Sequence, residues 1–135
     1  MAEKKENRTP TTVEKLLGVC TRAPQQLLRF KSWTDADGEP VVFRIRELSY
    51  NKVREIQDMN LGNNAGFTAA IITAGVVEPD LRDERLQKAV GAVTPYEVVY
   101  RMLRAGEVAD LQAAIEKLSG YRGSTLQILA GIEKN

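Results

Sequence analysis

The spacing of the apolar residues changes once along the chain, and this change constrains the fold more than any other feature. Between residues 27 and 46, polar and apolar residues alternate, which places Leu28, Phe30, Phe43 and Ile45 on one face of two strands. After residue 48 the apolar residues recur every three or four positions, as in helices buried on one side. The sequence therefore predicts an α+β, mostly helical fold, with an N-terminal β-hairpin packed on a bundle of about five helices.

Turn and capping residues locate the ends of these elements. Asp37-Gly38 favours a reverse turn between the two strands, because glycine adopts positive φ without steric cost. Thr11 and Glu14 have capping-box spacing at the start of a short helix over roughly residues 12–18, which we expect Gly18 to end. Further helices are predicted after Ser49, over 65–77, over 83–90, after Thr94, from about 106 to Gly120, and after Ser124.

The first ten residues differ in character from the rest of the chain. Residues 1–10 combine charged side chains with Thr9 and Pro10, and we interpret them as a flexible N-terminal arm. Residues 11–135 are predicted to form one domain, because a chain of 135 residues is of the size that builds one hydrophobic core. No apolar run approaches the roughly 20 residues that span a bilayer, and the polar N-terminus is unlike a signal peptide.

The composition argues against several classes of function. The chain has no histidine, which removes the commonest general base and the commonest metal ligand. The single cysteine, Cys20, excludes an internal disulfide and a cysteine-rich metal cage. Lys plus Arg number 19 against 18 Asp plus Glu, so the chain lacks the basic excess typical of nucleic-acid binders. We therefore predict no enzyme, no cofactor and no metal site.

Two short motifs invite a ligand-binding interpretation, and in both a structural role is favoured. The loop at 35–39 has some of the oxygen ligands of a calcium loop, but strands flank it and its ligand run is short, so turn chemistry explains it better. The glycine- and asparagine-rich stretch at 62–66 precedes a helix but lacks the lysine of a phosphate loop. We interpret that stretch as a loop with a helix cap.

Two sets of residues are candidates for partner binding. The first is the basic face of the hairpin, opposite its apolar face: Arg29, Lys31, Arg44 and Arg46. These cations can dock an acidic helix or a phosphate backbone, although a solvated face that deters strand pairing is the favoured interpretation. The second set is apolar and lies on the last two predicted helices: Leu118, Leu126, Leu129 and Ile132. Core packing is the simpler explanation of this second set.

Six segments of the chain follow one another in a characteristic order: VVFRIRELSY (41–50), ITAGVVEPDL (72–81), TPYEVV (94–99), AGEVADL (105–111), IEKLSGY (115–121) and IEKN (132–135). With these segments in this order, most of the chain resembles the XkdN-like tail assembly chaperones of long-tailed bacteriophages and prophages. The stretch at 122–130 is less acidic than the resemblance leads us to expect.

The resemblance implies a non-enzymatic protein that acts in the cytoplasm of the infected bacterium and is absent from the mature virion. Such chaperones are thought to bind the tape measure protein, keep it soluble and yield to the tail tube protein during tail assembly. An exposed apolar helix of the tape measure protein aggregates until it is covered, so this role has a clear physical basis. Self-association is a further candidate contact, either as a property of the chain or as a response to an uncovered apolar groove.

Two other functions are weighed against this one. The first is a structural tail or completion protein that is retained in the virion. The second, less favoured, is a small nucleic-acid-binding regulator that uses the basic hairpin face. The resemblance also suggests that the gene yields a longer, frameshifted product. The codons of Glu133, Lys134 and Asn135 are compatible with an A-rich slippery heptamer at which such a frameshift occurs.

Overall fold

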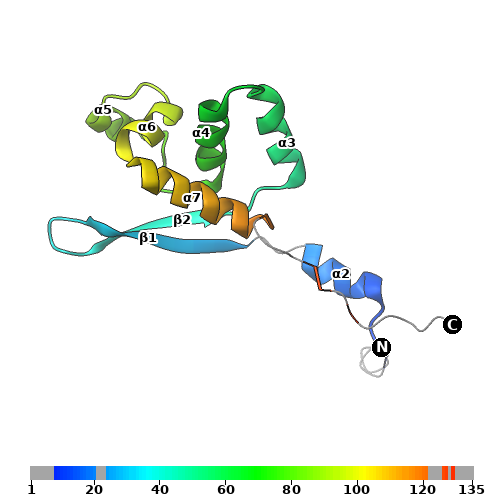
Figure 1. Cartoon of the computed structure of the whole chain (residues 1–135). Coiled ribbons are helices and arrows are strands. Elements are labelled where there is room, and N and C mark those ends of the chain that lie inside the picture. The colour runs from blue at the N-terminus through cyan, green and yellow to red at the C-terminus, as the bar shows by residue number, and fades with distance from the viewer. Residues whose placement is uncertain (1–7, 21–23, 122–125, 128, 130–135) are drawn as a thin grey trace.

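The computed structural model describes residues 8–20, 24–121, 126–127 and 129. Figure 1 shows a sheet covered on one side by helices, with α2 lying beyond one end of the sheet, away from the other helices. Within the described residues the elements are α2 (Thr12–Cys20), β1 (Gln25–Thr34), β2 (Pro40–Arg46), α3 (Tyr50–Met59), α4 (Asn64–Gly75), β3 (Val76–Glu78), α5 (Glu84–Val90), α6 (Pro95–Met102) and α7 (Ala105–Leu118). The predicted α+β, mostly helical fold is confirmed.

The hairpin of β1 and β2 has the predicted turn. The backbone N–H groups of Asp37 and Glu39 both donate to Asp35 Oδ1, at 2.8 and 3.0 Å. Gly38 follows with a φ of 81°, a value that glycine adopts most readily. The Asp35 carboxylate therefore closes the turn, as an aspartate at the start of such a turn commonly does.

The sheet has a third strand that the sequence analysis did not predict. Within the described residues the strand order is β1-β2-β3, and both pairings are antiparallel. The helix predicted over 65–77 ends at Gly75, and Val76 begins β3 opposite Ile45 of β2. The prediction of helix through Val77 was wrong because Val76 and Val77 continue the apolar run of α4 but are β-branched and favour a strand, in which Val76 and Glu78 pair with β2.

The predicted helix caps that fall within the described residues are present. Ser49 accepts the Lys52 N–H at the start of α3, and Asn63 accepts the Gly66 N–H at the start of α4. Thr94 and Glu97 form a capping box at α6, as Thr11 and Glu14 do before α2. Gly18 does not end α2, which continues to Cys20; a glycine inside a helix costs only about 1 kcal/mol relative to alanine.

The core lies between the sheet and the helices. Helix α4 packs against α3, α6, α7 and β3, while α7 lies across β1 and β2. The rings of Phe30, Trp33 and Phe43 meet on the inner face of the hairpin with centroids 5.3 to 5.6 Å apart. Gly75 lets α4 approach α7, because a Cβ at this position would lie 2.7 Å from two carbons of Ile115.

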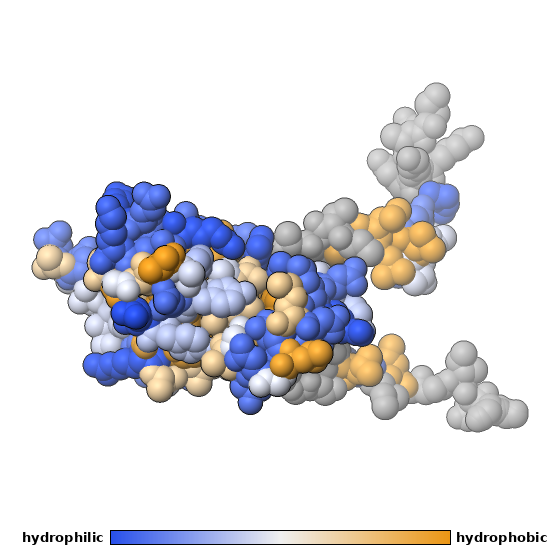
Figure 2. Space-filling model, turned by 90° about the horizontal axis from the view of Figure 1, so that it is seen from above, coloured by the Kyte–Doolittle hydropathy of each residue, from blue (hydrophilic) through white to orange (hydrophobic). Residues whose placement is uncertain are grey.

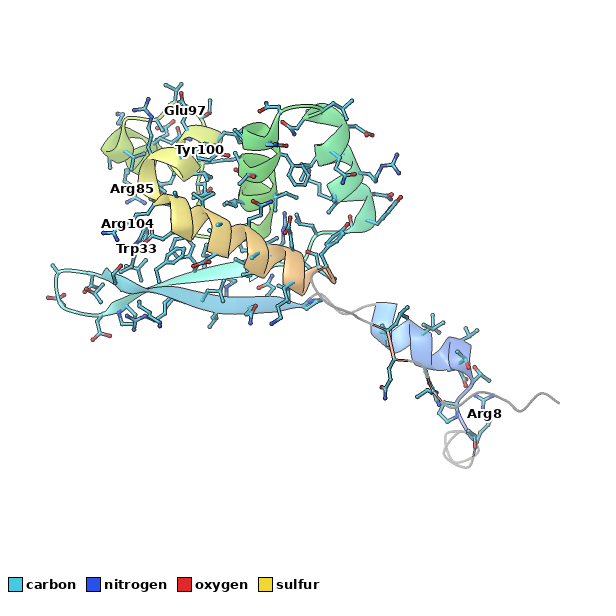
Figure 3. All side chains as sticks on the ribbon, in the orientation of Figure 1. Arg8, Trp33, Arg85, Glu97, Tyr100 and Arg104 are labelled. Carbon is cyan, nitrogen blue, oxygen red and sulfur yellow. The ribbon has the colours of Figure 1, made fainter. Side chains whose placement is uncertain are left out.

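One carboxylate joins the hairpin to the start of α7. Glu107 accepts the Arg104 backbone N–H through Oε1 at 2.8 Å and the indole N–H of Trp33 through Oε2 at 3.0 Å. Figure 3 shows Trp33 and Arg104 close together at this junction. The hairpin is thus fixed against α7 both by aromatic packing and by hydrogen bonding.

Candidate partner-binding surfaces

The basic residues of the hairpin share its outer face, as predicted for Arg29, Arg44 and Arg46. Arg44 lies opposite Leu27, Arg46 opposite Gln25 and Arg29 opposite Val42. Lys31 is exposed and falls in the part of β1 where the register is irregular.

Three of these basic side chains have partners within the chain. Arg44 Nε lies 3.4 Å from Glu78 Oε1, and Arg46 Nε donates to the carbonyl of Ala74 at 3.0 Å. Arg29 donates to the carbonyl of Lys31 at 3.0 Å. The third strand and the end of α4 therefore engage two of the cations, so the outer face is not a patch of four free positive charges.

The apolar candidates at the C-terminal end fall into different environments. Leu118 is partly buried and packs against the core, whereas Leu126 and Leu129 are 84% and 73% exposed. Leu126, Gln127 and Leu129 are not helical, so the prediction of a helix after Ser124 was wrong at these described residues. Ile132 lies outside the described residues, as does most of the helix predicted after Ser124.

Helix α2 presents a further apolar surface that the sequence analysis did not single out as a binding site. Val13, Leu16 and Leu17, at helical spacing, are 64%, 50% and 63% exposed, and we call them the α2 stripe. Figure 2 shows apolar atoms on the segments that project from one end of the molecule. The i, i+3, i+4 spacing was visible in the sequence, but this spacing usually indicates burial against the same chain.

An apolar pocket opens between α3, α4 and the end of α7. It has a volume of about 240 Å³, and its walls include Leu48, Phe67 and Tyr121. The Leu48 N–H donates to the Ser119 hydroxyl at 2.8 Å, which ties the chain before α3 to the end of α7. This pocket lies at the end of α7, where Tyr121 forms part of its wall.

The described part of the chain contains no group of three or more acidic, cysteine or histidine side chains placed to hold a metal ion. It also contains no helix long and apolar enough to cross a membrane.

The shifted titrating groups belong to helix caps and packing rather than to a reactive cluster. The Arg85 side chain and the Arg85 and Leu86 backbone N–H groups hold the pKa of Asp83 at about 2, below its usual 3.8. The Val93 backbone N–H lowers the pKa of Glu97 in the same way. Burial raises the pKa of Tyr100, whose hydroxyl donates to the Ala65 carbonyl. Figure 3 shows the Arg85, Glu97 and Tyr100 side chains around α5 and α6.

The Asp83 cap predicts a specific loss of stability in acid. Because the pKa of Asp83 is lower in the folded chain, its ionised form stabilises the fold above the unfolded value of 3.8, and this stability is lost as the pH falls toward about 2. Asp83→Asn keeps a capping oxygen but cannot titrate. Between about pH 5 and about pH 2.5, we expect the urea concentration at the midpoint of unfolding to fall less for this variant than for the parent. Equal losses in the two proteins would contradict the assignment.

The chain is similar to known proteins both in structure and in sequence. The crystal structure of the protein YqbN superimposes with a TM-score of 0.70 at 21% identity, and the match covers 85% of this chain and 100% of that one. At this identity the likeness establishes a common fold. No curated protein sequence matches the chain. The family model for the phage XkdN-like tail assembly chaperone protein matches residues 13–128.

The chain belongs to the XkdN-like tail assembly chaperone family. The matched region of this XkdN-like chaperone begins within α2 and extends beyond α7, so it includes the α2 stripe, the hairpin and Leu126. The candidate surfaces described above are therefore parts of the family domain, apart from Leu129 and Ile132.

Proposed function

We propose that this chaperone binds the tape measure protein, keeps it soluble and helps to recruit the tail tube protein during tail assembly in the host cytoplasm. The observation that carries the proposal is the α2 stripe, in which three large apolar side chains are at least half exposed. Soluble proteins rarely expose clustered apolar side chains unless these residues bind a partner. An amphipathic helix of a tape measure protein offers a complementary apolar face.

The position of α2 suits such a role. Helix α2 lies apart from α3–α7 (Figure 1), so a partner helix can reach its apolar side without opening the core. Leu126 and Leu129 supply further exposed apolar area at the C-terminal end. Binding through a few leucine contacts is also weak enough to be reversed, and we infer that the tail tube protein displaces the chaperone as the tube grows.

The test is co-expression with the tape measure protein encoded nearby, followed by affinity purification and measurement of its soluble fraction. We expect the parent chain to co-purify with soluble tape measure protein. Leu16→Asp combined with Leu17→Asp should weaken binding at least about tenfold, since burying one leucine stabilises a complex by about 1.5–3 kcal/mol and 1.4 kcal/mol corresponds to tenfold.

The matched control is Leu61→Asp, which changes a leucine that is 81% exposed but lies outside α2. We expect this control to bind as the parent does. If the parent leaves the tape measure protein insoluble and unbound, the proposed function is wrong. Equal binding by the α2 double variant and the control would instead remove α2 from the binding surface.

The proposed absence from the virion has a separate test, which also distinguishes the chaperone from a structural tail protein. Purified particles can be examined by quantitative mass spectrometry for peptides of this chain relative to tail tube protein. We expect no stoichiometric amount. Stoichiometric retention in purified particles would favour the structural or completion protein.

A further inference from the structure

A pocket beside α3 carries an excess of positive charge that the proposed function does not use. We propose that this pocket binds the carboxylate of an aspartate or glutamate on the protein partner, which deepens the proposed function and rests on it. The pocket has a volume of about 250 Å³. This volume is several times the roughly 30 Å³ that one water occupies in the liquid, so it is large enough for a carboxylate.

Three cations from separate parts of the chain line the pocket. Arg46 comes from the end of β2, Lys52 from α3, and Arg82 from the segment between β3 and α5. Glu55 is the one acidic residue among the lining residues, and it lies 3.6 Å from Lys52 Nζ. The lining residues thus carry a net charge of +2, whereas the net charge of the whole chain is only +1.

Both guanidinium groups keep donors free for a ligand. Arg46 is held by its Nε bond to the Ala74 carbonyl at 3.0 Å, which fixes the group at the pocket wall and leaves its terminal nitrogens available. Arg82 forms no ion pair with any residue that the structure describes. Arginine binds carboxylates through paired N–H groups, and such charge-assisted bonds are stronger than neutral ones.

A buried polar residue on α4 also belongs to the pocket wall. Thr73 is 8% exposed, and its Oγ1 atom is covered and has no hydrogen-bond partner among the described residues. Buried hydroxyl groups are normally paired, because an unpaired one keeps the full cost of leaving water. Since this atom is covered, the three cations and not the hydroxyl hold the carboxylate that we propose.

The surroundings of the pocket favour a protein carboxylate over a phosphate backbone. Met59, which is 75% exposed, and Tyr96, which is 42% exposed, also line it. An acidic residue on an amphipathic helix can place its carboxylate among the cations while a neighbouring apolar side chain covers Met59. A phosphate backbone has no apolar group to offer at that position.

The first test uses small probes and does not depend on the tape measure protein. The full chain is titrated with N-acetylglutamate N-methylamide, with its glutamine counterpart and with inorganic phosphate, while amide NMR signals are followed. We expect the glutamate probe to shift the Thr73, Ala74 and Arg82 signals, and the glutamine probe to leave them in place. No shift with the glutamate probe, or a shift with phosphate alone, would overturn the proposal.

The second test uses the tape measure complex and separates this proposal from the function. Arg82→Glu and Lys52→Glu should each weaken the complex about tenfold, as the loss of one charge-assisted contact does. Lys88→Glu, which reverses an exposed charge on α5 outside the pocket, should leave the affinity unchanged. If the parent binds and all three variants bind equally well, the pocket assignment is wrong and the proposed function stands. If the parent does not bind, the function is wrong and the NMR titration alone decides the pocket.

Discussion

Phe43→Ala is expected to lower the free energy of unfolding by about 3–5 kcal/mol, a large part of the about 5–15 kcal/mol of a typical domain. Phe43 is 1% exposed on β2. Its ring meets those of Phe30 and Trp33 in edge-on contacts at 5.4 and 5.6 Å, so the change removes both buried area and ring contacts. The cavity would lie between the hairpin and α7, whose Leu111 and Ala114 line the same region as Phe43.

Urea unfolding followed by circular dichroism and by Trp33 fluorescence measures this effect. Trp33 is the only tryptophan in the chain, so its emission reports directly on the ring cluster. Val42→Ala is the matched control, because Val42 is the neighbouring residue on the outer face of the same strand and is 47% exposed. The control should cost about 1 kcal/mol or less. Similar losses in both variants would show that Phe43 does not anchor the core.

Gly75→Ala is expected to destabilise the fold by about 1–3 kcal/mol, although alanine is the better helix former. The added Cβ would lie 2.7 Å from Cδ1 and from Cγ2 of Ile115, and Ile115 is fully buried. The overlap must be relieved by moving α7 away from α4 or by forcing Ile115 out of its rotamer. Both responses disturb the contact at the centre of the helical layer.

Gly106→Ala is the control for this second experiment, because a Cβ there meets nothing within 4 Å. We expect it to be neutral or to stabilise the fold by up to about 1 kcal/mol. Ile115→Val removes the Cδ1 atom, so the double variant with Gly75→Ala should be less destabilised than the sum of the two single changes. Strict additivity would show that the glycine and the isoleucine do not share one contact.

Much of the fold could be predicted because it depends on interactions between residues close in sequence. The Asp35 turn, the Ser49 and Asn63 caps and the Thr94-Glu97 capping box each join residues within four positions of one another. Such local signals do not depend on how the rest of the chain folds. The alternation in the hairpin also predicted correctly that Phe43 and Ile45 face the core.

The features that escaped prediction depend on residues far apart in sequence. β3 is a strand because Val76 lies beside Ile45 and Glu78 beside Arg44, and its own three residues do not reveal this pairing. The α2 stripe has the spacing of a buried helix face, so only the structure reveals its exposure. Similarly, Arg46, Lys52 and Arg82 meet only through the fold, and the hairpin alternation grouped Arg46 with other cations instead.

The direct passage from α4 into β3 has a consequence for how this chain unfolds. Gly75 ends the helix and Val76 begins the strand, with no loop between them. The sheet is therefore complete only when α4 is docked, and α4 cannot leave the core without pulling an edge strand from β2. We expect helical layer and sheet to be lost together, so that amides of α4 and of β2 exchange with solvent through the same global opening and at the same free energy.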